Sequence, residues 1–104
     1  MNVSVNRILD QDASLKVWLS EQEVLFGRLR VHDVAAFKML YQKYAAAIYG
    51  SIIRQVSDEE KAKSILTQTF CEVWQSFASY DETKLRIFTW INQLAVQNIK
   101  KATV

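Results

Sequence analysis

Apolar residues recur at intervals of three and four along most of the chain, which is the spacing of one face of an α-helix. The longest such stripe predicts a helix over about residues 34–55, with Asp33 as its N-terminal cap. Small residues within it, including Gly50, are expected to let a neighbouring helix approach closely. The positions predicted to be buried are Phe37, Leu40, Tyr41, Tyr44, Ala47, Ile48, Ser51 and Ile52.

Two further amphipathic stripes follow this helix. The segment "SDEE", residues 57–60, predicts a capping box at the start of a helix that runs to about Ser76. The polar break "ASYDETKL", residues 78–85, separates it from a last helix over about residues 85–101. The inner face of the first is predicted to hold Ala62, Ile65, Leu66, Thr69, Phe70, Val73, Trp74 and Phe77. The inner face of the second is predicted to hold Ile87, Trp90, Ile91, Leu94, Ala95 and Asn98 or Ile99, with both tryptophans mostly buried.

A shorter helix precedes these three. In "SEQE" the side chains of Ser20 and Glu23 are spaced for a capping box. The residues of this helix predicted to point inward are Val24, Leu25 and Leu29. Residues 1–19 are predicted to form a loosely ordered N-terminal segment, in which Leu15, Trp18 and Leu19 anchor a short helical turn. Residues 20–104 are predicted to form one helical domain.

Composition narrows the fold class. The chain has no proline and only two glycines, whereas a sheet protein needs many turns and turns use these residues. A length of 104 residues is enough to bury a core without disulfides or a structural metal. The predicted fold is therefore all-α, a compact bundle of three long helices plus a short N-terminal helix.

The reactive residue types are scarce. Cys71 is the only cysteine, so no internal disulfide can form, and a cytoplasmic, reducing setting fits. Its place in an apolar helix predicts a buried or half-buried thiol rather than a catalytic one. His32 is the only histidine and is predicted to be a surface loop residue. One cysteine and one histidine give no metal-ligand spacing, and no glycine-rich phosphate loop occurs. We therefore expect no catalytic residue, metal, cofactor or small-molecule substrate, and no enzyme.

Net charge and hydropathy indicate whether the chain is suited to bind nucleic acid or a membrane. The net charge is +2, which permits contact with nucleic acid without strongly favouring it. No apolar run approaches the roughly 20 residues needed to cross a bilayer, so no membrane contact is expected.

Once the helices are placed, two stretches of the sequence match the pattern of a known protein family. "LFGRLRVHDVAAFKMLYQKYAAAIY" begins at Leu25, and "TFCEVWQSFASYD" begins at Thr69. They resemble region 2, the N-terminal promoter-binding domain, of extracytoplasmic-function (ECF) sigma factors, from about Val24 to Lys101. Most of the matching positions lie on the predicted apolar stripes, so packing alone explains them and they speak for the fold more than for the function. The resemblance implies a domain that binds core RNA polymerase and the melted minus-ten promoter element in transcription initiation.

The resemblance implies a polymerase-contacting surface on the outer face of the helix that starts near Glu59. In the family this face is acidic and meets the clamp helices of the largest polymerase subunit. The aligned contact residues here are Lys61, Lys63, Ser64, Thr67 and Gln68, so the apolar positions are kept and most carboxylates are lost. Lysines opposite the arginines expected on the clamp would oppose docking. Three explanations are open: the partner surface has changed in step, the domain has left polymerase binding, or the exposed face has simply drifted. If the domain does not serve polymerase, this face is free to meet an acidic partner, or to lie in water with Glu59 paired to Lys63.

The resemblance also implies a surface for single-stranded promoter DNA, formed by the break before the last helix and by that helix. The break supplies Tyr80, Lys84 and Arg86 as possible contacts to DNA. Phe88 offers a ring for stacking on a base. For Tyr80 and Phe88, partial core or lid packing is at least as strong an expectation as stacking on a base. The predicted DNA-binding residues are Tyr80, Lys84, Arg86, Phe88, Asn92, Gln93, Gln97, Lys100 and Lys101.

Two functions from different classes stay open. One is the sigma-like initiation factor, for which an anti-sigma factor is a further partner that the resemblance allows. The other is a protein–protein interaction or regulatory module with the sigma region 2 fold that no longer binds promoter DNA. Continuation of the reading frame into a helix-turn-helix domain would favour the first.

Overall fold

The computed structural model describes residues 20–102, and all of the predicted helices occur in it. The elements are α3 (Glu21–Arg30), α4 (Val34–Val56), α5 (Glu59–Ser76), the 3-10 turn η1 (Phe77–Ser79) and α6 (Ile87–Ala102). The predicted N-terminal segment, with Leu15, Trp18 and Leu19, lies outside the described residues. Within the described range no strand occurs, which confirms the all-α prediction. None of the described helices is long and apolar enough to cross a membrane.

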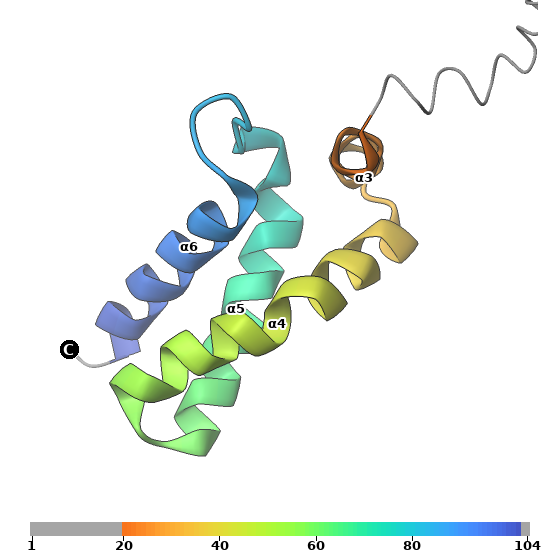
Figure 1. Ribbon diagram of the computed structural model, residues 1–104. Coiled ribbons are helices and arrows are strands. Elements are labelled where there is room, and N and C mark those ends of the chain that lie inside the picture. Colours follow the sequence, from red (N-terminus) through yellow and green to blue (C-terminus); the bar gives the residue numbers. More distant parts are fainter. Residues whose placement is uncertain (1–19, 103–104) are drawn as a thin grey trace, which may run out of the picture.

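Three helices form the body of the bundle and the fourth crosses one end. α4, α5 and α6 pack against one another in pairs, while α3 packs against α4 and η1 (Figure 1). The view in Figure 1 looks along α3, which therefore runs across the direction of the long helices. The loop between η1 and α6 closes the same end of the molecule as α3.

The helix starts follow the predicted caps with one exception. Ser20 and Glu23 form the expected capping box, and Asp33 caps α4 by accepting from the backbone N–H groups of Ala35 and Ala36. The predicted capping box at residues 57–60 is wrong. Ser57 ends α4 in a left-handed conformation, φ 60°, and Asp58 caps α5 by accepting from the N–H of Lys61. The tight α4–α5 connection uses Ser57 to stop one helix, so the next residue has to start the other.

The core follows the predicted stripes in the long helices but not at their edges. Leu40, Ile48 and Ile52 of α4 meet the buried faces of α5 and α6. Trp74 and Trp90 are partly buried, and Asn98 and Ile99 are both buried. Three predicted core positions are instead exposed, namely Val24, Tyr41 and Ala47. No helix approaches Gly50 closely, because an added Cβ there would meet only the Arg54 side chain, at 3.5 Å.

An aromatic cluster joins α3 to the rest of the molecule. Phe26, which is absent from the predicted core, is 1% exposed and lies 5.5 Å from both Phe77 and Tyr80 between ring centroids. Trp90 of α6 completes the cluster, 4.9 Å from Tyr80. The Tyr80 hydroxyl donates to the carbonyl of Leu85 at 2.6 Å and so closes the loop before α6. Edge-to-face and tilted ring pairs of this kind add to the free energy gained from burial.

Candidate functional site

The outer face of α5 carries the five predicted polymerase-contacting residues, and all five are exposed: Lys61, Lys63, Ser64, Thr67 and Gln68. The Thr67 hydroxyl donates to the carbonyl of Lys63 at 3.0 Å. The Gln68 amide donates to Glu72 Oε2 at 2.9 Å. Lys63 Nζ lies 4.0 Å from the carboxylate of Glu60, and both side chains are well solvated. The ion pair of Lys63 is thus with Glu60 and not with Glu59, the partner predicted for a face that does not serve polymerase. An exposed ion pair of this kind contributes little to the stability of the fold. The charges on this face therefore do not explain why the helix forms there.

A groove runs beside this face, between the first turns of α4 and the second half of α5. Its volume is about 520 Å³ and its walls are mainly apolar. Tyr41 packs against Phe70 at 4.9 Å and Phe37 against Trp74 at 5.3 Å between ring centroids. The residues lining the groove are Val34, Phe37, Tyr41, Thr67, Phe70, Cys71, Trp74 and Gln75.

Cys71 and His32 both lie at the groove, and the sequence made a prediction for the exposure of each. Cys71 is exposed, so the prediction of a buried or half-buried thiol is wrong. α5 turns this position toward the groove, where α4 does not cover it. His32 is exposed as predicted, with φ 56°, and its ring packs at a tilt of 55° against Trp74, with 4.6 Å between ring centroids. Its Nε2 lies 3.0 Å from the Trp74 carbonyl oxygen, so the α3–α4 turn is tied to the end of the groove.

On the α6 side the two candidate stacking rings have different surroundings. Tyr80 is 5% exposed, and its ring is enclosed by Phe26, Phe77 and Trp90. Burial also raises the pKa of its hydroxyl. For Tyr80, of the two open alternatives, the structure matches lid packing. Phe88 is 38% exposed and so leaves part of its ring open to solvent.

The predicted cations are exposed but fall into two groups. Lys84 and Arg86 precede α6, whereas Lys100 and Lys101 lie in its last turn. α6 has 16 residues. At about 1.5 Å per residue, the two groups are therefore about 24 Å apart. This arrangement suits an extended chain of phosphates better than a single compact anion.

The polar residues between these groups are only partly available. Gln93 and Gln97 are exposed. Asn92 is partly buried, and its Oδ1 is buried without a hydrogen-bond partner among the described residues. Such an acceptor costs folding free energy unless something supplies a donor.

A buried polar contact, not predicted from the sequence, fixes α6 against α5. The Asn98 amide donates to Thr69 Oγ1 at 3.2 Å and to Glu72 Oε1 at 3.1 Å. Thr69 donates in turn to the carbonyl of Ile65 at 2.7 Å. Because Glu72 also accepts from Gln68, the exposed α5 face and the α6 packing share one carboxylate. The signal in the sequence was the buried register of Thr69 and Asn98, both polar residues on apolar stripes.

The chain is similar to known sigma factors over most of its length. It is 26% identical over 76 residues to the "ECF RNA polymerase sigma factor SigK" of Mycobacterium tuberculosis strain H37Rv, a match that covers 73% of this chain and 41% of that protein. It is 28% identical over 87 residues to the protein of the same name from Mycobacterium sp. strain KMS, covering 84% of this chain and 45% of the relative. The matches support an ECF sigma factor-like region. The chain spans less than half the length of these relatives. No family model matches the sequence, and no solved structure matches it.

Proposed function

We propose that this chain is a sigma-like transcription initiation domain that binds core RNA polymerase and melted promoter DNA without enzymatic activity of its own. The observation that carries the proposal is the similarity to the SigK proteins, which covers 73% and 84% of this chain in the two matches. Two separate surfaces then serve two partners. The α5 side meets the polymerase, and the α6 side meets the DNA.

The polymerase surface combines the α5 outer face with the adjoining groove. Thr67 belongs to both, so a helix seated on the face would also reach the apolar wall of the groove. Apolar contact area in the groove offsets the loss of the carboxylates that the resemblance leads one to expect. A partner that presents fewer arginines than usual near Lys61 and Lys63 fits this face best.

Cys71 allows a direct test of polymerase binding. It is the only cysteine of the chain and lies exposed in the groove. We expect core RNA polymerase to slow alkylation of Cys71 in the full chain, with bovine serum albumin at the same mass concentration as the control. Unchanged alkylation at polymerase concentrations that retain the chain in a pull-down would place the contact elsewhere. No retention at all would contradict polymerase binding.

The DNA surface is tested by its dependence on salt. Lys84, Arg86, Lys100 and Lys101 contacting phosphates of a single strand would give a log–log salt slope of about −3, at about −0.7 per contact. Titration of a labelled single strand into the native chain and the quadruple alanine variant measures this slope. Binding that ignores salt, or that the quadruple variant retains in full, would contradict this surface.

The second candidate function is a regulatory interaction module with the same fold. The observation that favours it is the exposed pair Lys61 and Lys63, where the family pattern has carboxylates. An acidic partner protein would suit this face. It predicts no retention by core polymerase and no salt-dependent DNA binding in the two assays above.

A further inference from the structure

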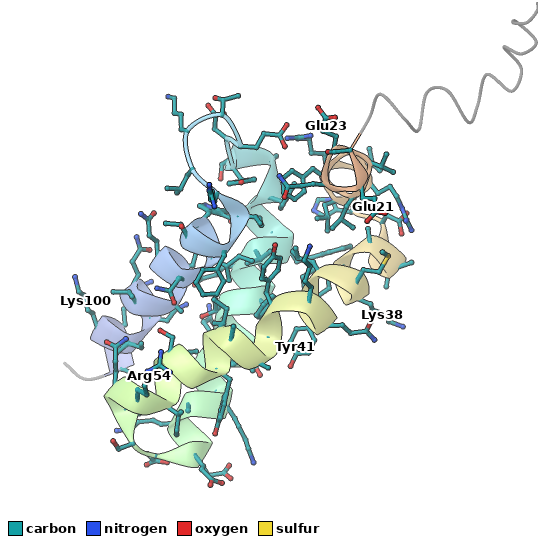
Figure 2. The ribbon with its side chains drawn as sticks, viewed as in Figure 1. Glu21, Glu23, Lys38, Tyr41, Arg54 and Lys100 are labelled. Atoms are coloured by element: carbon teal, nitrogen blue, oxygen red, sulfur yellow. The ribbon has the colours of Figure 1, made fainter. Side chains whose placement is uncertain are left out.

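Charge is segregated among the helices. Neither α4 nor α6 contains an acidic residue, and the acidic residues of the described chain belong to α3, α5 and the loops. Figure 2 shows this division in the labelled side chains, with Glu21 and Glu23 on α3, and Lys38, Arg54 and Lys100 on α4 and α6. A polyanion lying along α4 and α6 therefore meets no carboxylate from either helix.

An aromatic pair spans the contact between these two helices. The rings of Tyr44 on α4 and Phe88 on α6 lie 6.1 Å apart between centroids, tilted by 45°. Phe88 is 38% exposed and Tyr44 is partly buried. Lys43 Nζ lies 5.5 Å from the centroid of the Tyr44 ring. Accessible rings beside a cation are what proteins use to hold unstacked bases of single-stranded nucleic acid.

Open space adjoins Tyr44. Together with Lys43 it lines a hollow of about 200 Å³ between α3 and α4, whose walls are largely apolar. Glu21 also lines this hollow, and its carboxylate repels phosphate. The hollow therefore favours an uncharged group over a phosphate.

We propose that Tyr44 and Phe88 form a stacking site for an unstacked base of single-stranded DNA, with Lys43 at the neighbouring phosphate. This inference rests on the proposed function and deepens it, because it extends the DNA surface from α6 onto α4. Neither Lys43 nor Tyr44 belongs to the predicted DNA-binding residues. The site has three parts on two helices, so it exists only in the folded bundle.

The test compares strands with and without bases. The full chain is titrated with a short labelled oligo(dA) and with a strand of equal length whose nucleotides are abasic. We expect Tyr44→Leu and Phe88→Leu each to weaken binding of oligo(dA) by at least about fivefold, the lower end of the value of one stacked base. Neither should change binding of the abasic strand. Tyr44→Phe keeps the ring and should bind oligo(dA) like the native chain.

The chain supplies matched controls. Tyr41 is a tyrosine on the same helix that faces Phe70 of α5, so Tyr41→Leu should leave DNA binding unchanged. Lys43→Gln should make the salt slope shallower by about 0.7, the value of one phosphate contact, whereas Lys61→Gln on α5 should not. Circular dichroism checks that each variant is folded, and if Tyr44→Leu is not, Phe88→Leu and Tyr44→Phe decide the matter.

The outcomes separate this inference from the proposed function. If the native chain binds oligo(dA) with a salt dependence but both leucine variants bind it equally well, the stacking site is wrong and the DNA-binding function stands. If the native chain binds neither strand, the DNA-binding function fails and the stacking site fails with it. Equal losses on the abasic strand would also overturn stacking, because no base is there to stack.

Discussion

Asp33 joins two structural elements through one carboxylate. Its Oδ1 caps α4, and its Oδ2 accepts from Arg28 Nε at 2.8 Å. The Arg28 hydrogen bond, with help from the Ala36 N–H, lowers the pKa of Asp33 below its ordinary 3.8. The Thr83 hydrogen bonds lower the pKa of Asp81 in the same way.

These lowered pKa values predict a dependence of stability on pH. A carboxyl group with a lower pKa in the folded state contributes stability above its unfolded pKa, near 3.8. That stability is lost as the pH falls through the folded pKa. Asp33→Asn keeps a capping side chain but cannot titrate, so its melting temperature should lie below that of the native chain at neutral pH and converge with it in strong acid. Thermal melts across that range measure the difference. A constant gap between the two proteins would contradict the assignment.

Asn92 offers a second test at the residue scale. Its buried Oδ1 has no hydrogen-bond partner among the described residues, which costs about 1–3 kcal/mol for such a group. Asn92→Leu has a similar shape and removes the acceptor, so urea unfolding should show a more stable protein. Gln93→Leu at the exposed neighbouring position is the control and should change stability little. A destabilised Asn92→Leu would mean that the carboxamide is satisfied after all. A gain in stability together with weaker DNA binding would show that Asn92 serves the DNA surface.

At the scale of the element, α5 has one face buried against α4 and α6 and one face exposed to solvent. The residues that the resemblance aligns with acidic positions, Lys61, Lys63, Ser64 and Gln68, all lie on the exposed side, where changes of charge cost the fold little. Gln68 is the exception to free substitution, because it donates to Glu72, which also accepts from Asn98. A glutamate at position 68 would place two carboxylates one turn apart and disturb this contact.

Restoring the acidic pattern without touching Gln68 predicts a gain in polymerase binding. Lys61→Asp, Lys63→Glu and Ser64→Asp replace two repulsive charges with three attractive ones for a clamp rich in arginine. We expect this triple variant to bind a typical bacterial core enzyme more tightly than the native chain, and at least tenfold tighter if the face lies at the contact. The same changes made with glutamine at each site control for the loss of lysine alone. Equal or tighter binding by the native chain would mean that charge on this face does not govern docking.

At the scale of the whole molecule, Phe26 and Leu29 are the buried residues that attach α3 to the bundle. Phe26 is 1% exposed and contacts both Phe77 and Tyr80. Phe26→Ala should lower the free energy of unfolding by about 3–5 kcal/mol, the usual cost of removing a buried aromatic side chain. Val24→Ala on the same helix, at a position 41% exposed, should cost far less. Urea melts of the two variants decide the point, and similar small losses in both would mean that α3 is not part of the cooperative unit.

The sequence by itself determined the helices and most of the buried stripes. Caps at Ser20 and Asp33, and apolar spacings such as that of Leu40, Ile48 and Ile52, depend on residues within a few positions of one another. Local spacing therefore specifies them without reference to contacts between distant residues. The resemblance to sigma factors likewise rested largely on these packing positions.

Only the tertiary structure decided what lies at the edges of those stripes. Phe26 lies three positions before Leu29 on the same face of α3, whereas Val24 lies five positions before it, and the contact with Phe77 and Tyr80 buries Phe26. Tyr41 and Cys71 lie at apolar positions yet stay exposed, because α4 and α5 leave a groove between them. From the sequence, the Tyr80 ring could either stack on a base or pack in the core. In the structure it is enclosed by the rings of Phe26, Phe77 and Trp90. Each of these outcomes depends on how helices cross, and the crossing is set by contacts between residues far apart in the chain.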